Sequence, residues 1–329
     1  MKKLRYAVLA MAVTLLMNSA AMAKVSWDMP LPWPPENVHT QNAQIFADEV
    51  KKATKGEVEI KLHPGGALGY KGPEMLSVIR DGLAPIGQML TSQLVGEEKF
   101  FGIEAIAYLA PSLDSLAMLQ KFSRPEYERL AKKHNQKLLY HAPWPGQQVF
   151  TKKEITAIED LKNLKIRTVD KNSSDFFDNL GATAVQMPWG EVIPALASGA
   201  IDGVSTSSAS AVDGKFWEFI GFGSKFNWHS AGDIVTVNLD AWNKLSPELR
   251  EIIETKAKEL EPLFWKRVKE SDLKSEATLI EKGMKITTPG PELKAELLKR
   301  AQPVWENYMK TSPEARRVVE DYKLLMGIQ

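Results

Sequence analysis

The chain has 329 residues, of which 44% are hydrophobic and none is cysteine, and its formal net charge is +1. Without cysteine it can form no disulfide and offers no thiol nucleophile, so its stability must come from a hydrophobic core. Setting aside Lys2, Lys3 and Arg5, which belong to the N-terminal segment, leaves 39 basic and 41 acidic residues, a net charge of −2. This balance argues against a nucleic-acid-binding protein and against a protein that binds anionic membrane surfaces.

Residues 1–23 have the pattern of a cleavable secretory signal. The basic residues are followed by the apolar run "YAVLAMAVTLLM", and Ala21-Met22-Ala23 has the small-x-small form of a cleavage site. The apolar run is too short to span a bilayer. We therefore expect an exported mature chain that starts near Lys24. The alternative interpretation is a retained N-terminal anchor.

Strand and helix patterns alternate through the first 144 residues. In residues 40–56, for example, Thr40 is a candidate N-cap, apolar residues recur at helical spacing, and Gly56 ends the pattern. The sequence predicts strands at 24–30, 57–64, 84–90 and 136–144, and helices at 40–56, 73–82, 112–123 and 125–135.

The alternation restarts after Gly146, which indicates a second lobe. Predicted strands lie at 147–153, 165–168, 183–188 and 201–206, with helical segments at 157–164, 173–182 and 189–200. Such alternation is typical of helix-covered α/β sheets. A predicted helix of unusual length, at 246–283, should bridge two lobes, and a short strand and two helices complete the chain. We expect lobe I to comprise 24–144 plus about 233–272, and lobe II to comprise 145–232 plus about 273–329.

Catalytic and metal-binding motifs are absent from the sequence. The five histidines show no metal-ligand spacing, and neither HExxH, GxSxG nor a P-loop occurs. "GGALG", at Gly65–Gly69, is interpreted as a turn. The sequence therefore gives no support for an enzyme, and we expect no cofactor and no bound metal.

The central part of the chain resembles the signature region of the substrate-binding proteins of TRAP (tripartite ATP-independent periplasmic) transporters, the DctP-type family. The matching pieces, in chain order, are Glu159-Asp160-Leu161, Lys165-Ile166-Arg167, Leu180-Gly181-Ala182, Met187-Pro188, Glu191-Val192, Ala195-Leu196, Gly199 and Ile201-Asp202-Gly203. Segments before and after this region are also similar to the family, so that the resemblance covers essentially the whole mature chain.

The resemblance implies an α/β, two-lobed periplasmic binding protein fold with hinge-crossing strands and a long bridging C-terminal helix. It also implies a periplasmic receptor that closes on a solute and delivers it to the small and large subunits of a membrane permease. We expect the receptor to be a monomer. Transport in this family is driven by an ion gradient rather than ATP.

Arg167 is the leading candidate for ligand binding. It matches the family arginine that pairs with a ligand carboxylate, and a guanidinium offers a planar fork that fits a carboxylate. The alternative for an arginine at a strand end is a structural ion pair. Gln147 falls where some relatives have a second arginine, which favours a ligand with one negative charge. Thr206 stands where relatives often have an asparagine, with Ser205 or Ser207 as substitutes if the register slips by one residue.

Aromatic residues complete the predicted pocket. Trp189 follows Met187-Pro188 at a position that is commonly aromatic in the family and packs on the ligand. Trp33 and Trp144 lie in turns that tend to face the cleft, although core packing is the alternative for each. Gln88 is a further candidate, for which a solvent-facing strand position is the favoured alternative.

Several ligand classes and one other function remain open at this point. A small carboxylate is preferred, a sulfonate fits the same arginine, and an aromatic or zwitterionic solute could contact the tryptophans. A receptor that signals to a sensor protein, instead of feeding a permease, has the same sequence features.

Overall fold

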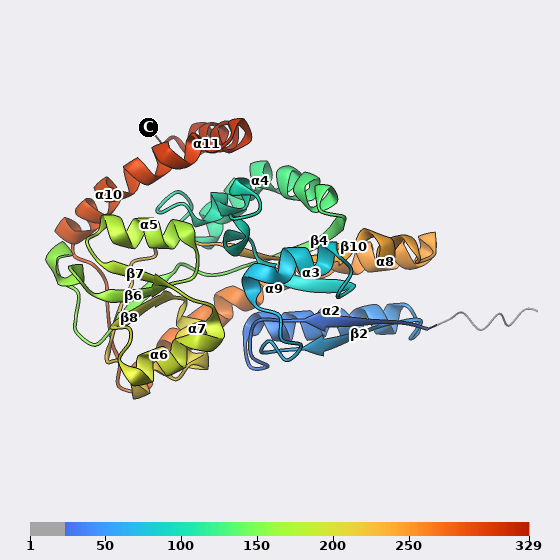
Figure 1. The fold of residues 1–329 in the computed structure, drawn as a ribbon, viewed down its shortest axis with the longest axis horizontal. Helices are drawn as coiled ribbons and strands as arrows, with labels where there is room; N and C mark the ends of the chain where they lie inside the picture. The colour runs from blue at the N-terminus through green and yellow to red at the C-terminus, as the bar shows by residue number, and fades with distance from the viewer. Residues whose placement is uncertain (1–23, 329) are drawn as a thin grey trace, which may run out of the picture.

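The computed structural model describes residues 24–328, so that the expected secretory signal, at residues 1–23, lies outside the described residues. Two groups of helices and strands lie side by side, the first around two small sheets and the second around one larger sheet, with a long helix passing between them (Figure 1). Within the described part of the chain, no helix has the length and apolar character needed to cross a bilayer.

The first group holds two small sheets. β1 (Val25–Pro30) and β2 (Val58–His63) pair in parallel, and α2 (Val38–Ala53) packs against β2. The second sheet has the order β3-β10-β4, and its middle strand is antiparallel to both neighbours. Its strands are β3 (Ile86–Leu90), β10 (Gly232–Asn238) and β4 (Gln136–Pro143). Because β10 comes from much later in the sequence, the chain returns from the second group to complete this sheet.

The second group is built on a six-stranded mixed sheet with the order β11-β9-β5-β8-β6-β7. β6 lies parallel between β8 and β7, whereas β5 is antiparallel to β8. The strands are β5 (Gln148–Thr151), β6 (Lys165–Thr168), β7 (Thr183–Gln186), β8 (Gly203–Thr206), β9 (Phe222–Ser224) and β11 (Lys285–Thr287). The helices of this group are α5 (Lys171–Asn179), α6 (Val192–Ser198) and α7 (Ser208–Asp213), with a short 3-10 helix, η5 (Trp189–Glu191), before α6.

The predicted bridging helix is present as α9 (Pro247–Glu281), which contacts α2 and β4 of the first group and α7 and β11 of the second. Ser246 caps its start by accepting a hydrogen bond from the Leu249 N–H. The two-lobed α/β fold with a long bridging helix is therefore confirmed. The remaining helices are α3 (Met75–Arg80), α4 (Leu113–Lys133), α8 (Leu239–Asn243), α10 (Pro291–Met309) and α11 (Pro313–Met326).

Two details of the predicted helices were wrong. α2 is capped by Asn37, whose side chain accepts from the His39 N–H, rather than by Thr40. The two helices expected on either side of Arg124 form the single helix α4, which runs through Pro125. Proline inside a helix costs about 3 kcal/mol, but side chains on both sides of Pro125 pack into one hydrophobic cluster, which outweighs that cost.

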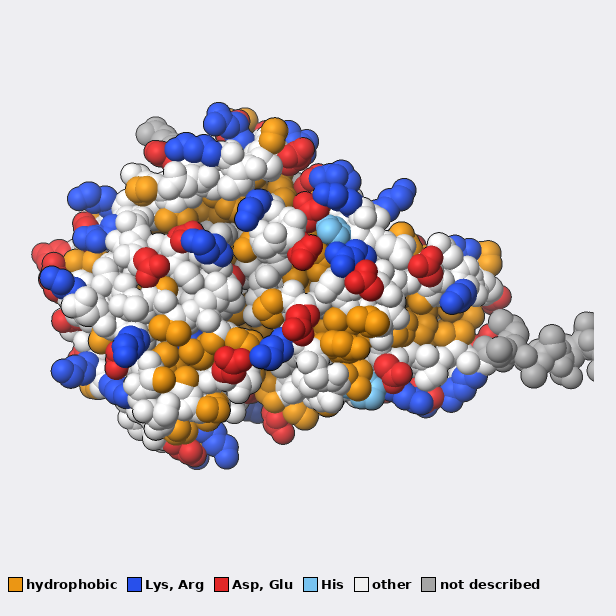
Figure 2. Space-filling model, viewed as in Figure 1, with side chains coloured by type: hydrophobic (Ala, Val, Ile, Leu, Met, Phe, Trp, Pro, Cys, Tyr) orange, Lys and Arg blue, Asp and Glu red, His pale blue; other side chains and the backbone are white. Residues whose placement is uncertain are grey.

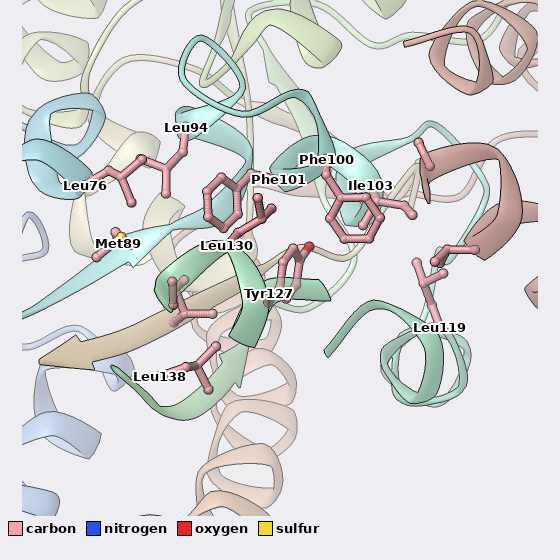
Figure 3. Close-up of a cluster of buried hydrophobic side chains, with 14 of the residues drawn as sticks. Leu76, Met89, Leu94, Phe100, Phe101, Ile103, Leu119, Tyr127, Leu130 and Leu138 are labelled. Carbon is pink, nitrogen blue, oxygen red and sulfur yellow. The ribbon is translucent and has the colours of Figure 1, made fainter. Parts of the chain in front are cut away.

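That cluster forms the largest part of the first core and draws on segments far apart in the sequence. Figure 3 shows Phe101 close to Tyr127 and Leu130 of α4, and Met89 of β3 belongs to the same cluster. Buried residues of α11 join the same cluster, among them Tyr322. The packing of α11 against α4 leads us to propose that residues 313–326 belong with lobe I, although the sequence-based boundaries assigned them to lobe II.

The face of the molecule shown in Figure 2 carries charges of both signs. Basic and acidic side chains are interspersed over the face shown in Figure 2, with small apolar areas between them. This distribution agrees with the nearly balanced composition of the chain.

Candidate functional site

A cavity lies where the strand ends of the two groups meet. Its walls come from the carboxyl ends of β6 and β8, from the turns after β1, β4 and β7, and from the segment that leads into β10. In open α/β sheets, ligands bind beyond the carboxyl ends of parallel strands. The lining residues are Trp33, Leu90, Trp144, Gln147, Arg167, Val169, Trp189, Thr206, Ser210, His229 and Ala231. All of the predicted ligand-binding residues except Gln88 are among them.

Arg167 is the charged residue of this lining. Its strand, β6, is an interior strand of the sheet, which explains why a cationic side chain is only 2% exposed. Nε and Nη2 both donate to the carbonyl oxygen of Met187, at 3.2 and 3.0 Å. These bonds fix the plane of the guanidinium. Within residues 24–328, no hydrogen-bond acceptor is found for Nη1.

The electrostatic environment of Arg167 suits an anion. Burial lowers the pKa of its guanidinium to about 10, an effect that the nearby Asp170 carboxylate partly opposes. The side chain is therefore still cationic at neutral pH. Asp170 caps α5 by accepting from the backbone and hydroxyl groups of Ser173, and burial raises the pKa of its carboxyl group. Because Asp170 does not line the cavity, the cavity itself presents a positive charge without a negative one.

Gln147 and Thr206 supply neutral polar groups. The Gln147 side chain donates through Nε2 to the Pro145 carbonyl at 2.8 Å, which leaves its Oε1 as the group free to accept from a ligand. Thr206 ends β8 and lines the cavity directly. The two serines considered as substitutes are used elsewhere: Ser205 Oγ accepts from the Trp228 indole at 3.0 Å, and Ser207 caps α7.

Trp189 forms one wall of the cavity beside the arginine. It opens η5 directly after β7, and the Arg167 Cζ lies 6.0 Å from its ring centroid. The indole is supported from behind by Phe216, with ring centroids 6.3 Å apart and planes at 26°. The ring is therefore held by packing and is only partly buried.

Trp33 and Trp144 form a second wall and are held by one buried carboxylate. Asp233, at the start of β10, accepts from the Trp33 indole at 2.7 Å and from the Trp144 indole at 2.9 Å. Gln88 donates to the same carboxylate at 2.7 Å. Burial raises the pKa of the Asp233 carboxyl group to about 6, although the three hydrogen bonds oppose this rise.

The position of Gln88 differs from the solvent-facing alternative. Its side chain is 1% exposed, so that a solvent-facing position is wrong, and it does not line the cavity. The register of β3 against β10 explains this placement: Gln88 lies opposite Val235, close to the start of β10, where its amide reaches Asp233 behind the indoles.

Sequence reasoning missed Asp233, His229 and Ser210. Asp233 lies in the run "GDIVTVN", outside every strand predicted from the sequence, and its three donors are far away in the sequence. His229 lies in an irregular segment between β9 and β10, where no periodic pattern exists. Ser210, on α7, accepts from the Ser207 hydroxyl at 3.1 Å. The only signal for it was the serine-rich stretch that follows Thr206.

Within residues 24–328, no cluster of three or more His, Asp or Glu side chains is arranged to hold a metal ion. The lining offers one cation, several neutral hydrogen-bonding groups and three indoles. This combination can bind a small organic anion and orient it.

Comparisons with known proteins also indicate a solute-binding protein. The family model for bacterial extracellular solute-binding protein, family 7 (DctP), matches residues 32–312. A solute-binding protein of Chromohalobacter salexigens is 24% identical, over 96% of this chain and 94% of the relative. The sialic acid-binding periplasmic protein SiaP of Vibrio cholerae is 22% identical, over 93% of this chain and 94% of its own length.

Solved structures share the whole fold. Two Bordetella pertussis extracytoplasmic solute receptors that bind pyroglutamic acid are 30% and 26% identical to this chain. Each superposes with a TM-score of 0.88, and the match covers 91% of this chain and 99% of the receptor. A TRAP solute-binding protein from a marine metagenome, in complex with co-purified pyroglutamate, is 29% identical with a TM-score of 0.87 and the same coverage.

Proposed function

Because this chain belongs to the bacterial extracellular solute-binding proteins of family 7, we propose that it captures a small organic monocarboxylate in the cavity around Arg167 and delivers it to a TRAP permease. The family resemblance found in the sequence is thereby confirmed. Members of this family are periplasmic solute receptors and not enzymes, and they work with membrane permease components.

The observation that carries the proposal is the lone charge of the cavity. Arg167 is held in a fixed orientation by Met187, while neutral groups and indoles make up the rest of the lining. A carboxylate bound there gains charge-assisted hydrogen bonds in a site with little water. A second carboxylate on the ligand finds no further cation among the lining residues, and an ammonium group finds no carboxylate. Both arguments favour a ligand with a single negative charge.

Pyroglutamate is our leading candidate for the solute. It is the ligand of the three solved relatives of 26–30% identity, and it is a small, cyclic monocarboxylate. Its flat ring suits a cavity walled by Trp33, Trp144 and Trp189, since indole faces contact planar apolar surfaces well. Its ring amide offers one donor and one acceptor to the neutral polar groups of the lining.

A thermal-shift screen tests this proposal. Ligand binding to the native state raises the melting temperature with the logarithm of ligand concentration over Kd. The panel holds pyroglutamate, aliphatic monocarboxylates, dicarboxylates, sulfonates and amino acids. We expect monocarboxylates to stabilise the protein more than dicarboxylates or amino acids of similar size. Stabilisation by sulfonates alone, or by no anion, would overturn the monocarboxylate proposal.

A further inference from the structure

His229 is a lining residue of the cavity for which no role has been assigned. It lies in the irregular segment between β9 and β10, and its side chain is 2% exposed. Its backbone carbonyl accepts from the Gln147 N–H at 2.8 Å, which fixes this segment beside the start of β5. His229 and Arg167 therefore lie on the wall of the same small cavity.

Both ring nitrogens of His229 are buried, and neither has a hydrogen-bond partner within the described part of the chain. Its neighbour Trp228 packs against the ring, with centroids 3.9 Å apart and planes at 65°, but the Trp228 indole N–H is already used by Ser205. Buried polar side chains are almost always hydrogen-bonded, so that an unpartnered imidazole on a cavity wall calls for an explanation.

The imidazole of His229 is uncharged at neutral pH. Burial lowers its pKa to about 3, and no carboxylate lines the cavity to favour the protonated form. A neutral imidazole presents one N–H donor and one nitrogen acceptor. It is therefore suited to an uncharged polar group and not to a second anionic group of the ligand.

We propose that His229 is a second ligand-binding residue, whose neutral imidazole hydrogen-bonds an uncharged polar group of the same monocarboxylate that Arg167 holds. This inference rests on the proposed function and adds the requirement that the ligand carry an amide, hydroxyl or keto group besides its carboxylate. It makes His229 a determinant of selectivity, because a ligand without that group leaves the buried nitrogens unpaired.

The test compares two ligands and two side chains by isothermal titration calorimetry. Pyroglutamate and cyclopentanecarboxylate share the five-membered ring and the carboxylate, but only pyroglutamate has the ring amide. The variant His229→Phe keeps a flat ring and removes both nitrogens. His63→Phe, at a partly exposed histidine that is paired with Asp28 and does not line the cavity, is the matched control. Circular dichroism and melting temperatures establish that each variant is folded.

We expect the wild-type protein to bind pyroglutamate about tenfold or more tightly than cyclopentanecarboxylate. In His229→Phe this preference should fall to about threefold or less, through weaker binding of pyroglutamate, while His63→Phe behaves as wild type. His229→Gln, which again offers a donor and an acceptor, should recover part of the preference and serves as the second variant if His229→Phe does not fold.

The outcomes separate this inference from the proposed function. If the wild-type protein binds monocarboxylates and the histidine variants keep the full preference, the role of His229 is overturned and the proposed function stands. If no monocarboxylate binds the wild-type protein, the proposed function and the role of His229 are both overturned. If the screen returns a different monocarboxylate, the comparison is made between that acid and its analogue without the uncharged polar group, with the same expected result.

Discussion

Trp33 and Trp144 donate their indole N–H groups to the two oxygens of one carboxylate, that of Asp233, at 2.7 and 2.9 Å. The two rings meet edge to face, with centroids 5.0 Å apart and planes at 75°. A hydrogen bond to an ionised acceptor is roughly twice as strong as one between neutral groups. Both rings are therefore held in place before a ligand arrives, which lowers the entropy lost on binding.

Asp233→Asn should disturb this wall. Asparagine keeps one carbonyl oxygen, but an NH2 group replaces the second carboxylate oxygen. At least one of the three N–H donors, the two indoles and the Gln88 amide, then faces another donor and loses its hydrogen bond. We expect pyroglutamate affinity to fall about tenfold and the tryptophan emission spectrum to shift, measured by calorimetry and fluorescence. Asp321→Asn, at an exposed position of α11, is the control. Unchanged affinity and emission in Asp233→Asn would contradict the positioning role.

Trp189→Ala should weaken binding by removing the wall beside Arg167. We expect a loss of about tenfold or more in affinity, because a large aromatic contact is deleted, and a partial recovery in Trp189→Phe. Trp217→Ala is the matched control, since Trp217 packs near Lys282 and does not line the cavity. Equal losses in the two alanine variants, measured by calorimetry, would point to a general destabilisation instead of a ligand contact.

The contribution of His39 to the free energy of unfolding should fall as the pH is lowered from 7 to 5. Burial lowers the pKa of its imidazole to about 3, so that the unfolded chain binds a proton below about pH 6.5 while the folded protein does not. The stabilisation is therefore complete above pH 6.5 and is lost as the pH falls toward 3. For one such histidine the loss between pH 7 and 5 is about 2 kcal/mol.

The variant His39→Phe isolates this contribution. Urea unfolding at pH 7 and pH 5 should show that the change in the free energy of unfolding between the two values is about 2 kcal/mol more favourable in the variant than in the wild type. Burial raises the carboxyl pKa of Asp213, Asp233 and Asp272 to about 6, which stabilises the fold as the pH falls from 6 toward 4 and opposes the histidines in both proteins. An identical pH dependence in the variant would show that His39 is protonated in the folded state.

Ligand binding should compact the protein in solution. Two contacts join the two lobes: Asn37 donates to Asp213 at 2.7 Å, and the Lys71 ammonium lies 3.0 Å from the Glu191 carboxylate. We propose that these contacts form on hinge closure. The radius of gyration from small-angle X-ray scattering should decrease when ligand is added, and less so in Asn37→Ala. A radius that does not respond to a bound ligand would argue against closure.

The fold and most of the cavity lining could be predicted from the sequence because their signals are local. Arg167 sits inside a short motif, Trp189 follows a recognisable strand, and Thr206 ends another. The buried residue that holds two of the lining tryptophans in place could not be predicted in the same way. Asp233 is separated from Trp33 by 200 residues, and only the return of β10 to the first group, between β3 and β4, brings them together. The continuity of α4 through Pro125 likewise depends on tertiary packing, which a local propensity does not contain.

The most direct test of the account is calorimetric titration of pyroglutamate into the wild-type protein, Arg167→Ala and Arg316→Ala. Arg316 is exposed on α11 and controls for the loss of an arginine. We expect 1:1 binding to the wild type and to Arg316→Ala, and a loss of about a hundredfold or more in Arg167→Ala, which should remain folded. Wild-type affinity in folded Arg167→Ala would contradict the central claim that this arginine anchors the ligand's carboxylate.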